Sequence, residues 1–232
     1  MNDYSEIYDP DLDFDRVFSR ATARVVSHRV MPQDTVLDLG CATGFVAECL
    51  TRSTSEIFYF GVDRSSAYLE RANGRNIDNA TFILGDIDNL ENISQQFDHV
   101  LLMNVLHEVQ SPVEVLRAAK SRLAAGGLLH VSLQNPSSIH RLAAFDAGMI
   151  DSIDEISERG TRFSTRRMLA QDELVDLIAG LGLTIVESRG VFLKPLPNED
   201  LAKLASDQLH ALELVAARFP QQSAINYVCA TP

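Results

Sequence analysis

The sequence predicts an α/β fold in which a parallel sheet carries helices on both faces. Short apolar runs alternate with segments of helical character from about residue 35 onward, which is typical of strand–helix–strand units. Three successive apolar runs also end on or beside a carboxylate, at Asp38, Asp63 and Asp86. The carboxyl ends of the strands form the edge of an open α/β sheet where ligands bind. We therefore expect a ligand site at that edge.

The first half of the chain shows the alternation most clearly. A helix ending near Val26 comes first, because apolar residues recur there at helical spacing. The expected strands then lie near 35–40, 56–63, 80–86, 97–105 and 127–135, and the expected helices near 44–52, 65–74 and 113–123. The last of these helices has a start signal, since Ser111 can cap it and Glu114 would complete a capping box. Gly126 and Gly127 are expected to turn the chain into the fifth strand.

The alternation breaks after the fifth strand. Residues 136–170 mix prolines, serines and glycines with apolar residues, which predicts a helix with loops rather than another regular unit. The pattern resumes with a helix near 171–180, a strand over 183–193 and a helix over 198–218. A last strand is expected over 224–230.

Length and composition are typical of a single soluble domain over residues 1–232. The chain has 232 residues, of which 46% are hydrophobic and 22% charged. No apolar run approaches the roughly 18 residues of a membrane span, and the acidic N-terminus lacks the apolar region of a signal peptide. We expect a cytoplasmic monomer or homodimer.

Charge and cysteine content narrow the partners. The formal net charge is −12, and no dense lysine or arginine cluster is present. Nucleic acids and anionic membranes are therefore disfavoured as partners, because proteins that bind them usually present a basic face. Cys41, Cys49 and Cys229 are scattered and odd in number, which indicates a reduced chain without disulfides or a metal site.

The segment Gly40-Cys41-Ala42-Thr43-Gly44 follows the first strand and opens a helix. Glycines there let the backbone approach a ligand, and the helix start offers unpaired N–H groups to a carboxylate. The spacing does not fit the G-x-G-x-x-G fingerprint, which disfavours a nicotinamide-binding fold. A plain strand–turn–helix with two convenient glycines is the alternative without a ligand.

Together with Asp38, this segment resembles the D-x-G-x-G-x-G motif of the class I, S-adenosylmethionine-dependent methyltransferases, with Ala42 in place of the middle glycine. The resemblance covers residues 30–232, and its specific motifs are confined to 36–107. It implies a doubly wound, seven-stranded and mostly parallel sheet with an antiparallel last strand and a small helical lid. It also implies S-adenosylmethionine as the cofactor.

The resemblance assigns cofactor contacts to the ends of the first four strands. Asp38 would serve the cationic amino group, directly or through water, and Asp63 would accept hydrogen bonds from both ribose hydroxyls. Asp86 and Ile87 would bracket the adenine. The predicted cofactor-binding set is Asp38, Gly40, Cys41, Ala42, Gly44, Asp63, Arg64, Asp86, Ile87, Asn104 and Val105. A helix cap remains the alternative for Asp63, and a solvated turn acid the alternative for Asp86.

Two histidines follow strands at the same edge and are the candidate bases. His107 lies after the fourth strand and His140 after the fifth, and an imidazole titrates near neutral pH. A packing role in a loop or on a helix face is the alternative for each. Arg141 could hold an anionic group of the substrate, because guanidinium suits carboxylate or phosphate. Tyr8, ahead of the first helix, is the other predicted substrate contact.

These observations predict a methyltransferase for a small molecule, most simply an O-methyltransferase of a bacterial glycan or secondary-metabolite pathway. N- or C-methylation, a nicotinamide-dependent oxidoreductase and a cofactor-binding regulatory protein without catalysis remain alternatives. Because the sheet edge is expected to bind the cofactor, the choice of acceptor should come from covering segments. We expect these at 1–28, 136–167 and 195–218.

Overall fold

The computed structural model describes residues 5–11, 14–90, 92–157, 160–161 and 165–232. Seven strands form one sheet in the order β3-β2-β1-β4-β5-β7-β6. They are β1 (Thr35–Leu39), β2 (Phe58–Asp63), β3 (Ala80–Leu84), β4 (Phe97–Met103), β5 (Leu123–Gln134), β6 (Thr184–Val191) and β7 (Ile225–Thr231). β7 is antiparallel to both of its neighbours, and the pairs among β1 to β5 are parallel. The predicted doubly wound sheet with an antiparallel last strand is confirmed.

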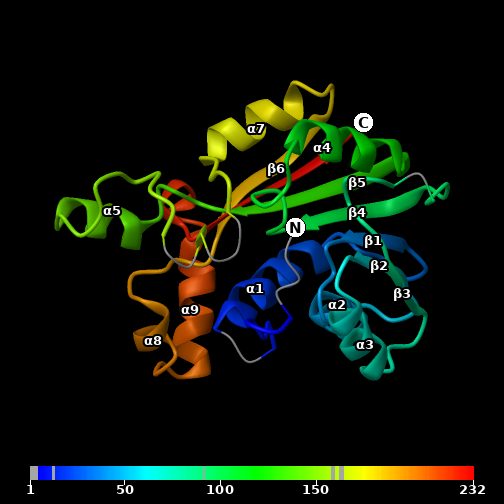
Figure 1. Cartoon of the computed structure of the whole chain (residues 1–232), viewed down its shortest axis with the longest axis horizontal. Helices are drawn as coiled ribbons and strands as arrows, with labels where there is room; N and C mark the ends of the chain where they lie inside the picture. Colours follow the sequence, from blue (N-terminus) through cyan, green and yellow to red (C-terminus); the bar gives the residue numbers. More distant parts are fainter. Residues whose placement is uncertain (1–4, 12–13, 91, 158–159, 162–164) are drawn as a thin grey trace.

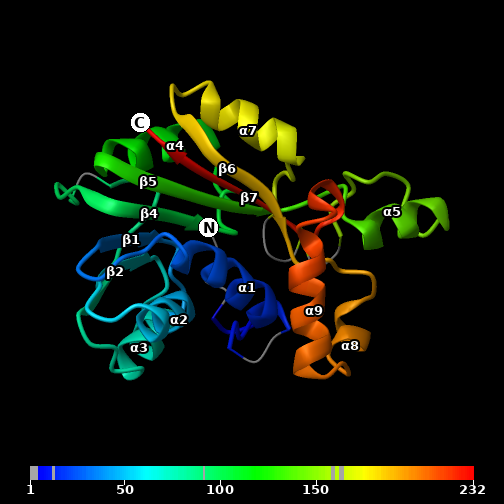
Figure 2. The same ribbon diagram turned by 180° about the vertical axis from the view of Figure 1, so that it is seen from behind.

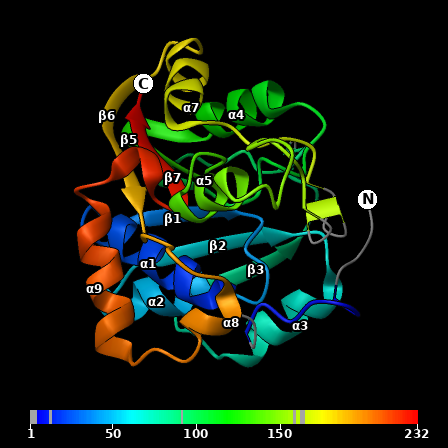
Figure 3. The same ribbon diagram turned by 90° about the vertical axis from the view of Figure 1, so that its left-hand side faces the viewer.

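Helices cover both faces of the sheet. Figures 1 and 2 show α4 (Pro112–Ser121) and α7 (Gln171–Ala179) on one face. The opposite face carries α1 (Asp15–Ser27), α2 (Phe45–Ser53) and α3 (Ser66–Gly74), and α8 (Asn198–Leu201) and α9 (Ser206–Ala216) continue this layer. α5 (Ile139–Asp146) projects from the carboxyl edge of the sheet, where it lies in front of the strands in Figure 3. A short 3-10 helix, η1 (Pro220–Gln222), precedes β7.

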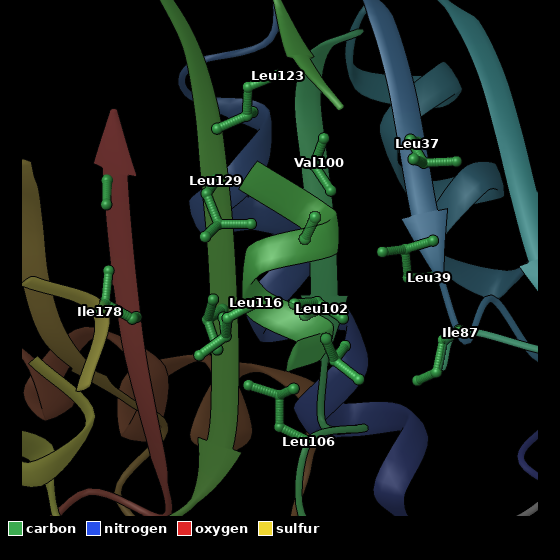
Figure 4. Packing of buried hydrophobic residues seen from close by; sticks show 14 of the residues in the cluster. Leu37, Leu39, Ile87, Val100, Leu102, Leu106, Leu116, Leu123, Leu129 and Ile178 are labelled. Carbon is green, nitrogen blue, oxygen red and sulfur yellow. The ribbon is translucent and has the colours of Figure 1, made fainter. Parts of the chain in front are cut away.

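Alternating residues of the central strands fill two separate cores. Leu37, Leu39 and Leu102 point toward α4 and pack with Leu116 beneath that helix (Figure 4). The intervening positions, among them Leu101, face α1 and α2 in the second core. Each fully buried leucine stabilises the fold by about 1.5–3 kcal/mol relative to an exposed one. The two cores hold the strands rigidly, so their carboxyl ends are fixed in space.

Three local expectations are wrong. Ser111 stands at the start of α4, but its side chain caps nothing, and Glu114 pairs instead with Arg117 on the exposed face. The glycine pair at 126–127 lies inside β5, where the register against β4 shifts, and does not precede the strand. The helix expected over 198–218 is two helices, because the side chain of Gln208 accepts the backbone N–H of residue 205 and starts α9 anew.

His130 is a buried core residue, and it belongs to a buried polar chain. His99 contacts Asp34 at 2.9 Å and the ring of His130 at 3.0 Å. The other ring nitrogen of His130 lies 2.7 Å from the hydroxyl of Tyr227. Burial lowers the pKa of His130 well below its ordinary value, which keeps this ring neutral. The chain ties β4, β5 and β7 together within the core.

Candidate active site

A cavity of about 590 Å³ lies at the carboxyl edge of the sheet. Its lining follows the strand order, from Asp86 after β3 through Asp63 and Asp38 to His107 after β4 and His140 after β5. The predicted site residues that line it are Tyr8, Asp38, Gly40, Cys41, Ala42, Asp63, Arg64, Asp86, Ile87, Asn104, Val105, His107, His140 and Arg141. The structure therefore brings together every predicted site residue except Gly44.

The turn after β1 is held by the end of β2. Gly40 and Ala42 both have positive φ angles, of 88° and 45°. One carboxylate oxygen of Asp63 accepts the backbone N–H of Ala42 at 2.8 Å, and the other accepts that of Ser65 at 2.9 Å. Because a non-glycine residue rarely adopts the left-handed conformation, the contact to Asp63 stabilises it at Ala42. Ser65 itself caps α3 by accepting the N–H of Tyr68, so Asp63 is not the cap of that helix.

Gly44 serves internal packing. It has a φ of 74°, and a Cβ added there would meet the ring of Phe82 at 2.9 Å and Ala72 at 3.1 Å. A Cβ at this position would face α3 and β3, and Gly44 is not among the residues that line the cavity. That Gly44 lets the backbone approach a ligand stays a prediction. At Gly40, which does line the cavity, a Cβ would lie 2.9 Å from a methyl group of Val105. The close approach at each glycine is therefore between parts of the protein.

Asp38 has a buried carboxyl group, and within the described structure one of its two oxygens is hydrogen-bonded and the other is not. Its side chain accepts a hydrogen bond from the hydroxyl of Tyr59 through Oδ2, whereas Oδ1 is buried and has no partner among the described residues. Burial, reinforced by the nearby Asp63, raises the pKa of Asp38 to about 7, although the Tyr59 hydrogen bond acts in the opposite direction. Asn104, at a φ of 54°, likewise has a buried side-chain oxygen without a partner. Both oxygens suit a ligand that donates hydrogen bonds or carries positive charge.

The two candidate bases are neutral imidazoles. Burial lowers the pKa of His107 to about 4. The pKa of His140 is lowered to about 3 by burial and then by the positive charges of Lys194 and Arg141. In both rings Nδ1 is buried without a partner in the described structure. Each ring can therefore accept a proton from a ligand, but alone each is a weaker base than free imidazole.

Comparison with known proteins identifies the family. The model of a family described as a methyltransferase domain matches residues 31–169. The chain belongs to this family. A computed comparison with solved structures gives a TM-score of 0.68 to an S-adenosylmethionine-dependent methyltransferase from Mesorhizobium loti, at 18% identity over 93% of this chain and 100% of that one. The class I methyltransferase predicted from the glycine turn is confirmed, with S-adenosylmethionine as its cofactor.

Curated relatives share part of their length with this methyltransferase. The ubiquinone biosynthesis O-methyltransferase of Dinoroseobacter shibae is 30% identical over 71% of this chain and 65% of the relative. The protein of the same name from Ruegeria pomeroyi is 30% identical over 69% of this chain and 64% of the relative. The match thus spans slightly less than two thirds of these relatives.

The residues at the sheet edge fit S-adenosylmethionine. The buried Oδ1 of Asp38 and the side-chain oxygen of Asn104 are acceptors in need of a donor, which the cofactor's ammonium group would supply. Asp63 already accepts two backbone N–H groups, yet a carboxylate has further lone pairs for ribose hydroxyls. Asp86 stabilises its own turn by accepting the N–H of Asp88 at 3.0 Å, and Ile87 packs into the core beside the cavity.

Arg141 and Tyr8 line the cavity and are also tied to the protein. Arg141 donates from Nε to the carbonyl of Ile153 at 2.9 Å and from Nη2 to the carbonyl of Glu155. These bonds hold the segment after α5 against the site, so an anion would have to use the remaining N–H groups of Nη1 and Nη2. Tyr8 donates to Asp15 at 3.2 Å, and its carbonyl accepts the hydroxyl of Tyr68 at 2.9 Å.

Residues 8–11 form an acidic strap along one side of the cavity, where Tyr8 and Pro10 belong to the lining. Asp9 and Asp11 contact Arg71 of α3 at 2.6 and 2.7 Å, and Asp11 also pairs with Arg75. Arg75 in turn pairs with Glu48 of α2.

Residues of the first and second predicted covers that line the cavity are Tyr8, Pro10, Asp15, Phe18, Ser19, His140, Arg141, Ala144, Ile150, Ser157, Gly160 and Thr165. From the third predicted cover, 195–218, the described lining includes Asn198 alone.

Outside the predicted covers, sequence reasoning missed two charged residues of the lining, Glu108 and Lys194. Glu108 directly follows the predicted base His107, and this neighbourhood was the one available signal. Its pKa is raised to about 7, by burial first and by Asp63 as well, against the lowering effect of Arg64. Lys194 follows β6, a strand without a recognisable ligand motif.

Among the described residues there is no group of three side chains suited to a metal, nor a helix that could span a membrane.

Proposed function

We propose that this methyltransferase transfers its methyl group to the oxygen of a small molecule with an acidic, phenol-like hydroxyl. The observation that carries the proposal is the pair of neutral imidazoles, His107 and His140, in the lining beyond the glycine turn. When bound, the cofactor supplies an electrophilic methyl group on a sulfonium, whose C–S electron pair returns to sulfur on transfer. The protein then has to align the acceptor, exclude water and remove one proton.

The strength of the available bases favours a phenol over an aliphatic alcohol. A phenolic hydroxyl has a pKa of about 10. Water, which stands here for the less acidic class of hydroxyl that includes an aliphatic alcohol, has a pKa of about 15.7. His107, Glu108 and His140 have pKa values of about 4, 7 and 3, so as bases they match the more acidic hydroxyl. Apolar residues such as Phe18, Met168 and Ile225 in the lining suit the ring of such an acceptor.

The names of the curated relatives support oxygen as the acceptor atom, because both are O-methyltransferases of ubiquinone biosynthesis. The predicted glycan or secondary-metabolite pathway has no counterpart in these names. The family match also argues against the nicotinamide-dependent alternative. The three predicted covers remain our proposal for the segments that select the acceptor.

A competition among three acceptors tests the proposal. The purified protein and S-adenosylmethionine would be offered a catechol, a benzyl alcohol and an aniline of equal ring size, with the methylated product identified by mass spectrometry. We expect O-methylated catechol as the main product. Methylation confined to the aniline nitrogen would overturn the choice of oxygen, and equal turnover of the benzyl alcohol would overturn the phenol.

The bases are tested with the best acceptor from that competition. Replacing the true base by alanine should lower kcat by about 10²–10⁴-fold. Cofactor affinity, measured by calorimetry, should change little in His107→Ala and His140→Ala. Full turnover in both variants and in the double variant would exclude both histidines.

A further inference from the structure

Glu108 is the meeting point of three parts of the site. Its Oε2 lies 3.2 Å from Nη2 of Arg64, which follows β2, and its Oε1 lies 3.6 Å from Nε2 of His107. Its carbonyl accepts Nε of Arg166 at 3.2 Å, and the carbonyl of His107 accepts the backbone N–H of Arg166 at 2.8 Å. The end of the second cover thus fixes the backbone of both residues. Neighbours in sequence, His107 and Glu108 are held with both side chains in the lining of one cavity.

The two ring nitrogens of His107 have different surroundings. Nε2 lies 3.6 Å from Oε1 of Glu108, and Nδ1 is buried with no partner in the described structure. An imidazole that only filled space would not need a carboxylate at one nitrogen and an unused acceptor at the other. A buried nitrogen without a partner destabilises the fold, and a ligand hydroxyl at Nδ1 would remove that penalty. The arrangement is that of an imidazole backed by an acid.

We propose that His107 and Glu108 act together as one proton acceptor, with His107 contacting the acceptor hydroxyl and Glu108 compensating the charge that forms on the ring. This inference rests on the proposed O-methylation. In the step, the acceptor O–H bond breaks, its proton goes to Nδ1, and the electron pair stays on the oxygen that forms the new bond to carbon. The Nε2 proton of the resulting imidazolium then faces the Glu108 carboxylate.

The charges around the pair explain why it works near neutral pH and His107 alone does not. With a pKa of about 4, His107 by itself would be a poor base. Glu108, with a pKa of about 7, is ionised above that pH, and its negative charge then favours protonation of the neighbouring ring. Asp63 raises the pKa of Glu108, and Arg64 lowers it. Arg166 contributes a third charge from the cover. We expect the pair to titrate as one unit, with its first proton taken up where Glu108 titrates.

Histidine NMR on the free protein tests the pair without any acceptor. The protein would be labelled with ¹⁵N-histidine, and the signals of His107 assigned by their loss in His107→Gln. In the wild type we expect the ring shifts of His107 to change with a midpoint near pH 7, because they report the charge of Glu108. In Glu108→Gln that midpoint should disappear. An unchanged titration in Glu108→Gln, or no inflection between pH 6 and 8 in the wild type, would overturn the coupling.

Turnover then tests whether the coupled pair serves catalysis. We expect Glu108→Gln to lower kcat by about 10²-fold or more at pH 7.5 and to abolish the inflection of kcat near pH 7. Glu108→Asp, which keeps a carboxylate, should recover part of both. Glu114→Gln is the matched control, because it removes an exposed acid on α4 that pairs only with Arg117, and its profile should equal that of the wild type.

The outcomes separate the two proposals. Coupled NMR titrations together with N-methylation in the acceptor competition would support the pair as a charged unit and overturn its role as a base for oxygen. O-methylation with an unchanged pH profile in a folded Glu108→Gln would overturn the pair and leave the proposed function standing. If thermal melting shows that Glu108→Gln is unfolded, Glu108→Asp carries the same comparison.

Discussion

Replacing Asp38 by asparagine should change how the stability of the protein depends on pH. The carboxyl is 1% exposed, and burial raises its pKa from 3.8 to about 7. A folded-state pKa above the unfolded value means that the protonated carboxyl stabilises the fold below about pH 4. That contribution is lost as pH rises through 7. Asparagine keeps the shape and an acceptor for Tyr59 but has no proton to lose.

The size of the effect follows from the difference between the two pKa values. About three pH units at about 1.4 kcal/mol each amount to about 4 kcal/mol in favour of Asp38→Asn above pH 8. About 2–3 kcal/mol of this falls between pH 5 and 8. Because Glu108, His107 and His140 titrate in both proteins, only the difference between variant and wild type isolates Asp38.

Urea denaturation of both proteins at pH 5, 6, 7 and 8 measures this difference. We expect the gain in unfolding free energy of Asp38→Asn to grow steadily across the series, at equal m-values. The same variant should bind S-adenosylmethionine more weakly, since it loses the negative charge opposite the ammonium group. A pH-independent difference in stability would refute the buried, uncompensated carboxyl, and unchanged cofactor affinity would refute its role at the ammonium.

Three other perturbations test the frame of the site. Asp63→Ala should weaken cofactor binding about ten- to a hundredfold, as measured by calorimetry. It should also lower the melting temperature, because it removes two hydrogen bonds that fix the glycine turn. An unchanged melting temperature would show that other contacts hold the turn. Gly44→Ala should destabilise the fold by at least about 1 kcal/mol in urea denaturation, given its positive φ and the contact with Phe82, and a neutral result would contradict that packing. Arg75→Gln should speed cofactor dissociation in stopped-flow fluorescence by releasing the acidic strap, whereas the exposed Arg52→Gln should not.

The core of the site could be predicted because it depends on local sequence and on one topological rule. Each acid or glycine turn follows its strand directly, and parallel strands place their carboxyl ends on one edge. Asp38, Asp63 and Asp86 therefore lie along one cavity although they are more than twenty residues apart. The buried side chains of the strands point alternately to two cores, and this also follows from a period of two.

What could not be predicted depends on partners that are distant in sequence. Glu108 is paired with Arg64 across the end of β1, and no spacing rule connects the two positions. The strap is held because Asp11 pairs with Arg75, directly after α3 and sixty-four residues away. The packing of Gly44 could not be predicted for the same reason, since the ring it must avoid comes from β3. The expected capping box at the start of α4 does not form either, because the side chain of Glu114 pairs with Arg117.

The distribution of unsatisfied groups explains why the cavity, and not another part of the molecule, is built for a ligand. In the described part of the chain, eleven buried side-chain atoms lack a hydrogen-bond partner. Five of them belong to residues of the cavity lining, namely Asp38, Asn104, His107, His140 and Asn198. Each such atom costs the fold about 1–3 kcal/mol, a sizeable share of a typical stability of about 5–15 kcal/mol. The fold accepts this cost where a donor from cofactor or acceptor can recover it, so binding and folding are coupled through the same few atoms.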